Sequence, residues 1–308
     1  MQLLRSPLEL PTHARRVCLA IGTFDGVHLG HQQVIRQALM NARQHAARAV
    51  VVTFDAHPAT IVAPHRVPPL ICSLPQKLRA IDALGVDATL LLHFDRALSE
   101  QPAEEFIRGL VRDFGQVHSI CVGAQFTFGH RRGGNVELLR RLGTELNFTI
   151  HGLASVALDG QTVSSTRIRE AIRTGSLDAA SQMLGRAYAL AGTVVPGDQV
   201  GRQLGFPTAN LDTRAQILPP NGVYAVLART GNTTHSAALN IGLRPTRAQP
   251  TPQIHVEAHL LDFTGDLYGT ELELTFVEKL RDEKKFPDLA ALQSQIALDL
   301  THARAALA

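Results

Sequence analysis

Two histidines, His28 and His31, stand three residues apart in a glycine-rich stretch near the start of the sequence. The apolar run 17–21 before them is typical of a buried strand, and the apolar spacing in 34–42 predicts a helix after them. The histidines therefore fall at the first turn of that helix, where free backbone N–H groups and the helix dipole favour an anion. Imidazole N–H groups can add hydrogen bonds to phosphate oxygens. The stretch is predicted to bind phosphate, with capping or surface histidines as the alternative.

A second polar segment, Ser-Ser-Thr-Arg-Ile-Arg at 164–169, combines three hydroxyls with two arginines. Serine and threonine are favoured at helix N-caps, and the apolar residues that follow them predict a helix. Hydroxyls and arginines at one helix start form an anion site, and a capped surface helix is the alternative. The segment falls in the same predicted domain as the two histidines, so we expect it to make a second contact to phosphate.

The second half of the sequence has a glycine-rich segment, 197–205, followed by Pro-Thr-Ala-Asn at 207–210. The segment lacks the pattern G-x-x-x-x-G-K-[ST], which argues against a P-loop kinase. Its glycines would let a nucleotide approach backbone N–H groups closely. Further along, Glu257 interrupts an apolar strand. This carboxylate either faces solvent by strand alternation or takes part in the chemistry of a site.

The hydrophobic pattern predicts the elements that position the first two segments. Strands at 17–21, 49–54, 88–94 and 119–123 alternate with helical segments. Such alternation predicts an α/β domain, with a parallel sheet and helices on both faces.

After about residue 183 the alternation stops, and short β-rich segments follow at 189–195, 222–229, 236–241, 254–261 and 271–277. Strands of this size with frequent turns predict a small antiparallel barrel or sandwich. A closing helix is predicted at 288–305, and its apolar face consists of Leu289, Leu292, Ile296 and Leu300. We therefore expect two domains, 1–185 and 186–308.

Composition limits the classes of protein that fit. The 308 residues are 45% hydrophobic and 19% charged, with a formal net charge of +3, and no arginine- or lysine-rich block indicates a nucleic-acid partner. Three distant cysteines, Cys18, Cys72 and Cys121, indicate neither disulfides nor a cysteine metal site. No secretion signal or membrane span is visible. We expect a cytoplasmic protein without a membrane or nucleic-acid partner.

The motifs together resemble one family. The sequence G-T-F-D-G-V-H-L-G-H at 22–31 is similar to the H-x-G-H signature of nucleotidylyltransferases and, in this extended form, to the adenylyltransferase half of bacterial bifunctional riboflavin kinase/FAD synthetases. The S-S-T-x-x-R element at 164–169 and G-R-x-L-G-F before Pro-Thr-Ala-Asn resemble further elements of that family, and the matches run in family order from about 17 to 286. The resemblance implies a Rossmann-like nucleotidylyltransferase domain, followed by an antiparallel β-barrel kinase domain with a closing helix.

The resemblance also implies two reactions and the residues for each. The second domain would phosphorylate riboflavin to FMN, with Glu257 as general base and with Thr208 and Asn210 as ligands of Mg²⁺ beside ATP. The first domain would adenylylate FMN with a second ATP, and His28 and His31 would stabilise charge. The other implied adenylyltransferase contacts to ATP or FMN are Gly22, Phe24, Asp25, His57, Gln125, Asn135, Ser165, Thr166 and Arg169. The implied kinase contacts to ATP or flavin are Gly197, Gly201, Arg202, Gly205, Pro207, Thr208, Asn210 and Arg281.

Two positions depart from the family pattern. Gln125 stands where the family has Asp or Asn, and Pro196 stands where it often has His. The longer side chain at 125 moves the polar end by about one carbon–carbon bond, and an error of about 1 Å matters in a catalytic pose. A riboflavin kinase with weak or absent adenylylation is therefore one alternative, and a flavin-binding regulatory protein is another. The implied partners are riboflavin, FMN, FAD and ATP, and weak self-association is left open.

Overall fold

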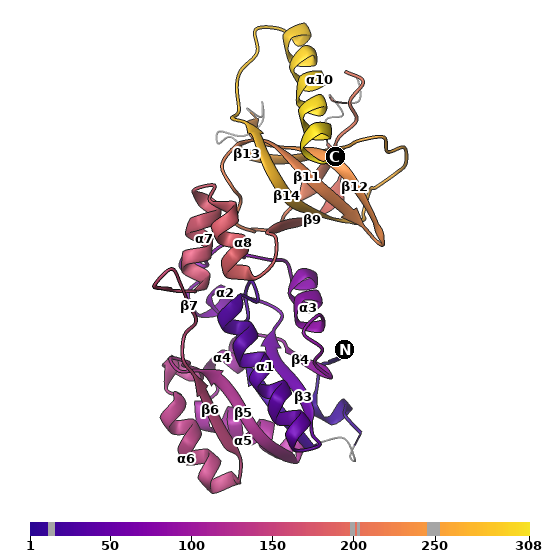
Figure 1. Ribbon diagram of the computed structural model, residues 1–308. Coiled ribbons are helices and arrows are strands. Elements are labelled where there is room, and N and C mark those ends of the chain that lie inside the picture. The colour runs from indigo at the N-terminus through magenta and orange to yellow at the C-terminus, as the bar shows by residue number, and fades with distance from the viewer. Residues whose placement is uncertain (12–15, 198–200, 202–203, 245–252) are drawn as a thin grey trace. The chain divides into compact units, whose positions relative to one another are not determined.

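The computed structural model describes residues 1–308 except 12–15, 198–200, 202–203 and 245–252. The chain, drawn in Figure 1, forms two compact units. The first comprises Met1–Arg167 with Met183–Gly185, and the second comprises Ile168–Gln182 with Arg186–Ala308. The predicted border between 185 and 186 stays a prediction, and the structure groups residues 168–182 with the second unit. In the described part of the chain, no helix has both the length and the apolar character that a membrane span requires.

The first unit is built on a parallel sheet with the strand order β1-β4-β3-β2-β5-β6. Its strands are β1 (Gln2–Leu4), β2 (Arg16–Ile21), β3 (Arg48–Phe54), β4 (Ala88–Leu92), β5 (Gln116–Gly123) and β6 (Thr149–Leu153). Its helices are α1 (Leu29–Gln44), α2 (Ala59–Val62), α3 (Leu74–Asp82), α4 (Arg96–Glu100), α5 (Ala103–Phe114) and α6 (Val136–Leu146), with 3-10 turns at Pro7–Glu9, Pro64–Arg66 and His130–Arg132. A two-stranded pair, β7 (Ala157–Leu158) and β8 (Gln161–Thr162), precedes α7 (Ser165–Arg173). The predicted parallel α/β fold is confirmed, and β1 and β6 add an edge strand on either side.

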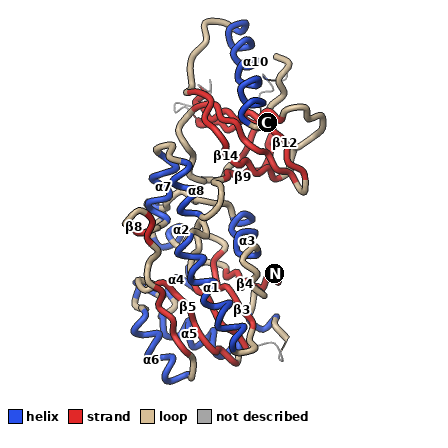
Figure 2. The backbone as a smooth tube through the Cα atoms, viewed as in Figure 1, coloured by secondary structure: helices blue, strands red, loops and turns tan. Residues whose placement is uncertain are grey.

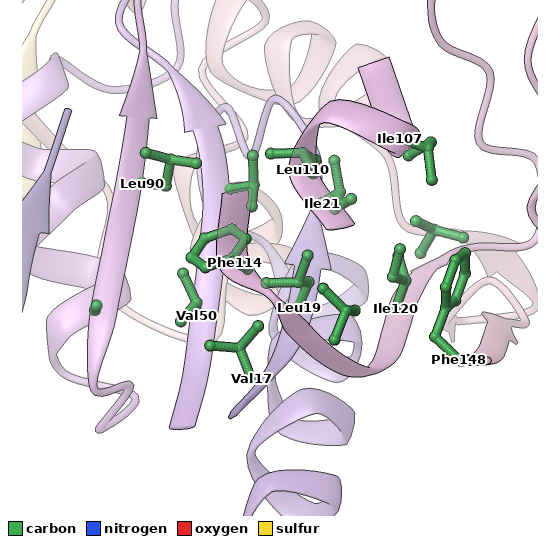
Figure 3. Packing of buried hydrophobic residues seen from close by; sticks show 14 of the residues in the cluster. Val17, Leu19, Ile21, Val50, Leu90, Ile107, Leu110, Phe114, Ile120 and Phe148 are labelled. Atoms are coloured by element: carbon green, nitrogen blue, oxygen red, sulfur yellow. The ribbon is translucent and has the colours of Figure 1, made fainter. Parts of the chain in front are cut away.

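Helices cover both faces of this sheet. Successive strand residues point to opposite sides, and apolar side chains on both sides need to be buried. On β2, Val17, Leu19 and Ile21 belong to a buried cluster with residues of α5 and α6. Figure 3 shows these three side chains together with those of α5. Cys18 and Ala20, which alternate with them, belong to a second cluster with residues of α1 and α3. The sheet is thus buried on both sides, and the carboxyl ends of its strands are left to carry function.

The second unit contains a closed antiparallel barrel with the strand order β10-β13-β12-β11-β14-β9, whose strands are red in Figure 2. After α8 (Leu177–Leu184), the strands are β9 (Ala189–Val195), β10 (Ala209–Asp212), β11 (Gly222–Thr230), β12 (Thr233–Arg244), β13 (Gln253–Leu260) and β14 (Glu271–Arg281). Strand β9 pairs with both β10 and β14, which closes the ring. The predicted barrel is confirmed, and β10 is a strand that the sequence pattern did not reveal.

The closing helix α10 (Leu289–Ala306) begins after Asp288, whose side chain caps it. The helix packs on the outside of the barrel through Leu300 and Ala303. The predicted apolar face is wrong at Leu289, which is 64% exposed. The structure instead buries the charged residue Asp299 on this helix.

Candidate active sites

The glycine-rich loop, defined here as residues 22–28, connects β2 to α1 at the carboxyl end of the strand. Open α/β sheets bind their ligands at this edge. The backbone turns sharply, with positive φ at Phe24 (50°), Gly26 (81°) and Val27 (42°). The Phe24 ring is buried against Gly22, where a Cβ would lie 2.9 Å from it. The loop therefore needs glycine at both 22 and 26.

The predicted histidine pair is assembled at the start of α1. His28 is the N-cap, and its Nδ1 accepts the N–H of His31 at 3.4 Å. The two rings stack with 3.6 Å between their centroids, and Phe24 makes an edge contact with His31. Because Nδ1 of His28 accepts, Nε2 carries the proton in the neutral ring. Burial, and then the charges of His28 and Lys77, hold the pKa of His31 well below its ordinary value.

Asp25 connects this loop to the start of α7. Its buried carboxylate accepts the N–H of Ile71, at 3.1 Å through Oδ1 and at 3.3 Å through Oδ2, and these bonds connect the loop to residue 71. Its backbone carbonyl accepts the Ser165 hydroxyl at 3.2 Å. The starts of α1 and α7 therefore lie together, and Ser165 and Thr166 stand at the second one. Arg169 lies further along α7, in the part that belongs to the second unit.

A small cavity of about 50 Å³ lies beside the glycine-rich loop. The residues that line it are Thr23, Asp25, Asp55, Ala56, His57, Leu70, Cys72, Leu74 and Lys77. The Nδ1 of His57 accepts the N–H of Ala59 at 3.1 Å, so the imidazole helps to start α2. Asp55 bonds the His93 ring at 2.6 Å, and this bond raises the pKa of His93. The motifs did not assign a role to Asp55 or Lys77, although Asp55 directly follows a predicted strand.

The segment 123–135 carries Gln125 and Asn135. Gln125 is exposed in the turn after β5, and Asn135 is the N-cap of α6, with its Oδ1 accepting the N–H of Leu138 at 2.9 Å. Phe126 and Phe128 stack at 5.2 Å and pack against the core of the sheet. These two rings anchor the segment on the core of the sheet.

In the barrel, Glu257 and Asn210 lie side by side on adjacent strands. Asn210 of β10 pairs in register with Glu257 of β13, which pairs in turn with Asn240 of β12. The residues that flank each of them, such as Leu211 and Val256, point into the barrel core. The three polar residues therefore project from the outer face. Glu257 is nevertheless only 8% exposed. Sequence reading assigned no role to Asn240.

Glycines of the predicted kinase segment lie directly against the candidate metal ligands. A Cβ at Gly197 would lie 2.3 Å from Nδ2 of Asn210. A Cβ at Gly201 would lie 2.5 Å from the carbonyl oxygen of Phe206 and 3.2 Å from Oγ1 of Thr208. A side chain at Gly201 would therefore meet backbone, whereas a side chain at Gly197 would have to displace the Asn210 amide. Two other predicted residues of the segment do not show such a contact. Gly205 is exposed and has a φ of 88°, and Arg202 lies outside the described residues.

A cavity of about 550 Å³ opens at the barrel beside these residues. Its lining residues are Val194, Pro207, Thr208, Ala209, Asn210, Ala258, Leu260, Phe263, Thr264, Gly265, Asp266, Leu267 and Tyr268. Its volume falls in the range of small-molecule and cofactor sites. Pro207, Thr208 and Asn210, which are far from the aromatic segment 263–268 in the sequence, thus share one hollow with it.

Arg281 is held in an ion pair with α10. Its guanidinium contacts both carboxylate oxygens of Asp299 at 2.7–3.1 Å, and Asp299 is 3% exposed. Arg281 does not line the cavity beside Thr208. The contact of Arg281 to a flavin or to ATP stays a prediction. The contact that the structure shows is the ion pair with Asp299.

Together these features define a class of protein with two candidate sites, one in each unit. One is an α/β unit with paired histidines at a helix start, and the other is a barrel with a buried carboxylate, Glu257, beside Asn210. The family described as "FAD synthetase" matches residues 10–167, and the family described as "Riboflavin kinase" matches 184–307. The chain belongs to the family of bifunctional riboflavin kinases/FMN adenylyltransferases.

Relatives match along the whole chain. A protein of Pseudomonas fluorescens named "Bifunctional riboflavin kinase/FMN adenylyltransferase" is 37% identical over 305 residues, which cover 99% of this chain and 97% of that protein. The protein of the same name from Escherichia coli (strain K12) is 37% identical over 306 residues and covers the same shares. A crystal structure described as a macrolide-efflux protein from Streptococcus pneumoniae has a TM-score of 0.80 and 27% identity, and the match covers 98% of each chain.

Proposed function

We propose that the two reactions of the family run at two separate sites of this chain. Riboflavin is phosphorylated to FMN beside Glu257, and FMN is adenylylated to FAD at the glycine-rich loop. The activities follow from membership of the family. The observation that carries the division of labour is that Glu257 and Asn210 are paired in the barrel, whereas His28 and Ser165 belong to the α/β unit.

Adenylylation needs charge stabilisation more than a base. An oxygen of the FMN phosphate forms a bond to the α-phosphorus of ATP while the bond to pyrophosphate breaks. That phosphate is already ionised at neutral pH, so no strong base is required. His28 would meet phosphate oxygens as a donor through Nε2–H, since Nδ1 is used in the cap. The start of α7, with Ser165 and Thr166, adds further donors beside Asp25.

Riboflavin phosphorylation requires a proton acceptor and a cation. The ribityl hydroxyl oxygen forms a bond to the γ-phosphorus, ADP leaves, and Glu257 takes the hydroxyl proton. The side chains of Thr208 and Asn210 offer the oxygen donors that Mg²⁺ prefers, and Mg²⁺ commonly takes few protein ligands. Among the described residues, no group of three His, Cys, Asp or Glu side chains could hold a metal ion. The oxygen donors of Thr208, beside Gly201, and of Asn210, beside Gly197, fit the ion, which would neutralise phosphate charge when bound.

Matched variants test the division of labour. The chain is incubated with riboflavin, excess ATP and Mg²⁺, and riboflavin, FMN and FAD are separated by chromatography over time; FMN should appear before FAD. His28→Ala should stop FAD formation and leave FMN formation within twofold. Glu257→Gln should stop FMN formation, while supplied FMN is still converted to FAD. Equal loss of both activities in either variant would refute the assignment, and unchanged riboflavin with wild-type protein would favour a flavin-binding protein.

Two finer expectations belong to the same proposal. We expect Mg²⁺ dependence of the kinase reaction, because Thr208 and Asn210 line the same cavity and carry the oxygen donors that a hard cation prefers. A cytoplasmic location and weak self-association stay predictions. Fractionation and sedimentation measurements respectively would check them.

A further inference from the structure

Lys77 is a buried cation beside the glycine-rich loop that no motif picked out. It lies in the first half of α3, whose start is fixed by a capping box between Ser73 and Gln76. Its side chain is only 9% exposed, which is rare for lysine unless its charge is compensated. Its Nζ lines the small cavity together with Asp25 and Asp55. A lysine in this position needs a reason, because burial of an ammonium is costly.

The hydrogen bonds of Lys77 account for its three N–H groups. Nζ donates to the carbonyl oxygen of Phe54 at 2.6 Å, to that of Thr23 at 3.4 Å and to Oγ1 of Thr53 at 3.5 Å. The Thr53 hydroxyl itself donates to the Thr23 carbonyl at 3.1 Å. Three acceptors match the three donors of the ammonium form. The lysine thereby joins the end of β3 to the second residue of the loop.

We propose that Lys77 is a positioning residue for FMN adenylylation, whose buried ammonium fastens the glycine-rich loop to the end of β3 and so fixes the histidine pair. The inference rests on the adenylylation site proposed above. Thr23 precedes Phe24, and the ring of Phe24 packs against His31. A shift of the loop at Thr23 is therefore passed on to the imidazoles, where about 1 Å is enough to reduce catalysis strongly.

The same ammonium affects the electrostatics of the pair. After burial and the charge of His28, the charge of Lys77 is the next cause that lowers the pKa of His31. Burial also lowers the pKa of Lys77, whereas Cys72, Asp25 and Asp55 act in the opposite direction. Removing the lysine charge makes protonation of His31 easier, so the pKa of His31 rises. A purely structural residue on α3 would leave that titration unchanged.

The test compares Lys77→Met with Gln76→Ala. The first removes the ammonium and keeps most of the apolar stem; the second weakens the cap of the same helix and leaves the ammonium in place. Folding of the first unit is checked with a thiol reagent, because Cys18, Cys72 and Cys121 are free, buried and all in this unit. We expect Lys77→Met to lower kcat for FMN adenylylation at least tenfold while the three thiols stay unreactive, which shows that the unit is folded. The pKa of His31, measured by NMR, should rise. Gln76→Ala should stay within twofold and leave that pKa unchanged.

Other results overturn the inference. It fails if Lys77→Met keeps kcat within twofold, or if both variants lose activity equally. If the thiols of Lys77→Met become reactive, Thr53→Val decides: reduced kcat with protected thiols supports the inference, and unchanged kcat refutes it. His28→Ala distinguishes a failure of the role proposed for Lys77 from a failure of the proposed adenylylation site. If it stops adenylylation while Lys77→Met does not, only the role of Lys77 is lost; if wild-type protein forms no FAD from FMN, the proposed site itself fails.

Discussion

Replacing Gly197 by alanine should slow riboflavin phosphorylation through the displacement of one side chain. The added Cβ would lie 2.3 Å from Nδ2, 2.5 Å from Cγ and 2.8 Å from Oδ1 of Asn210, and real Cβ contacts under 3.0 Å do not occur. The backbone of Asn210 is held on both sides, by Val195 and by Glu257. The amide of Asn210 must therefore move, and its oxygen leaves the position proposed for Mg²⁺.

The expected loss follows from the interaction removed. A hydrogen bond or similar polar contact to a charged group contributes on the order of 1.5–3 kcal/mol, which corresponds to a rate decrease of about 10- to 150-fold. Initial rates of FMN formation at saturating ATP and Mg²⁺ measure it. FMN adenylylation in the same chain serves as internal control and should stay unchanged. Gly109→Ala, in α5 at a position without positive φ where a Cβ meets nothing within 4 Å, is the glycine control.

A double-mutant cycle shows whether the clash with Asn210 is the cause. In an Asn210→Ala background the atoms that meet the new Cβ are gone, so adding Gly197→Ala should cost almost nothing further. Full additivity of the two losses would refute this reasoning. So would an unchanged rate for Gly197→Ala alone.

Two further predictions concern stability, measured as urea midpoints. Asp299→Ala leaves Arg281 without its buried carboxylate partner and should destabilise the barrel unit by about 3 kcal/mol. Asp262→Ala, in an exposed ion pair with α10, should change the urea midpoint far less, because solvent screens the pair; equal costs would contradict the burial argument. The His118 ring lies against that of His45, with 3.7 Å between the centroids and a tilt of 31°. Burial, followed by the charge of His45, lowers the pKa of His118. The unfolded state therefore binds more protons, so stability is lost as pH falls through about 6.5. His118→Phe should reduce this loss between pH 7 and 5, and an unchanged slope would count against it.

The features predictable from sequence are those that depend on local pattern. Alternation in the run 17–21 places Val17 and Leu19 on one face of the sheet and Cys18 on the other, and the structure has this arrangement. Helix starts were found because capping uses particular side chains: Asp288 begins α10, as expected. The histidine spacing likewise located His28 at the first turn of α1.

The features that sequence could not predict depend on partners distant in the chain. Strand β10 is too short to show a pattern, and only pairing with β9 and β13 makes it a strand. Lys77 looks like an ordinary helix lysine until Phe54 and Thr23 are brought to it. Nothing in the sequence connects Arg281 to Asp299, eighteen residues further on, so this ion pair could not be predicted. Tertiary contacts, rather than local propensity, decide these positions.

Hydrogen bonds within the fold limit what each site residue can do for a ligand. A helix N-cap uses one acceptor atom of its side chain and leaves the rest. In His28 the cap takes Nδ1, so a further partner of the neutral ring is met through Nε2–H. In Asn135 the cap takes one lone pair of Oδ1, and the Nδ2 amide supplies the donors. We predict that both residues would meet the anionic groups of ATP or FMN as donors.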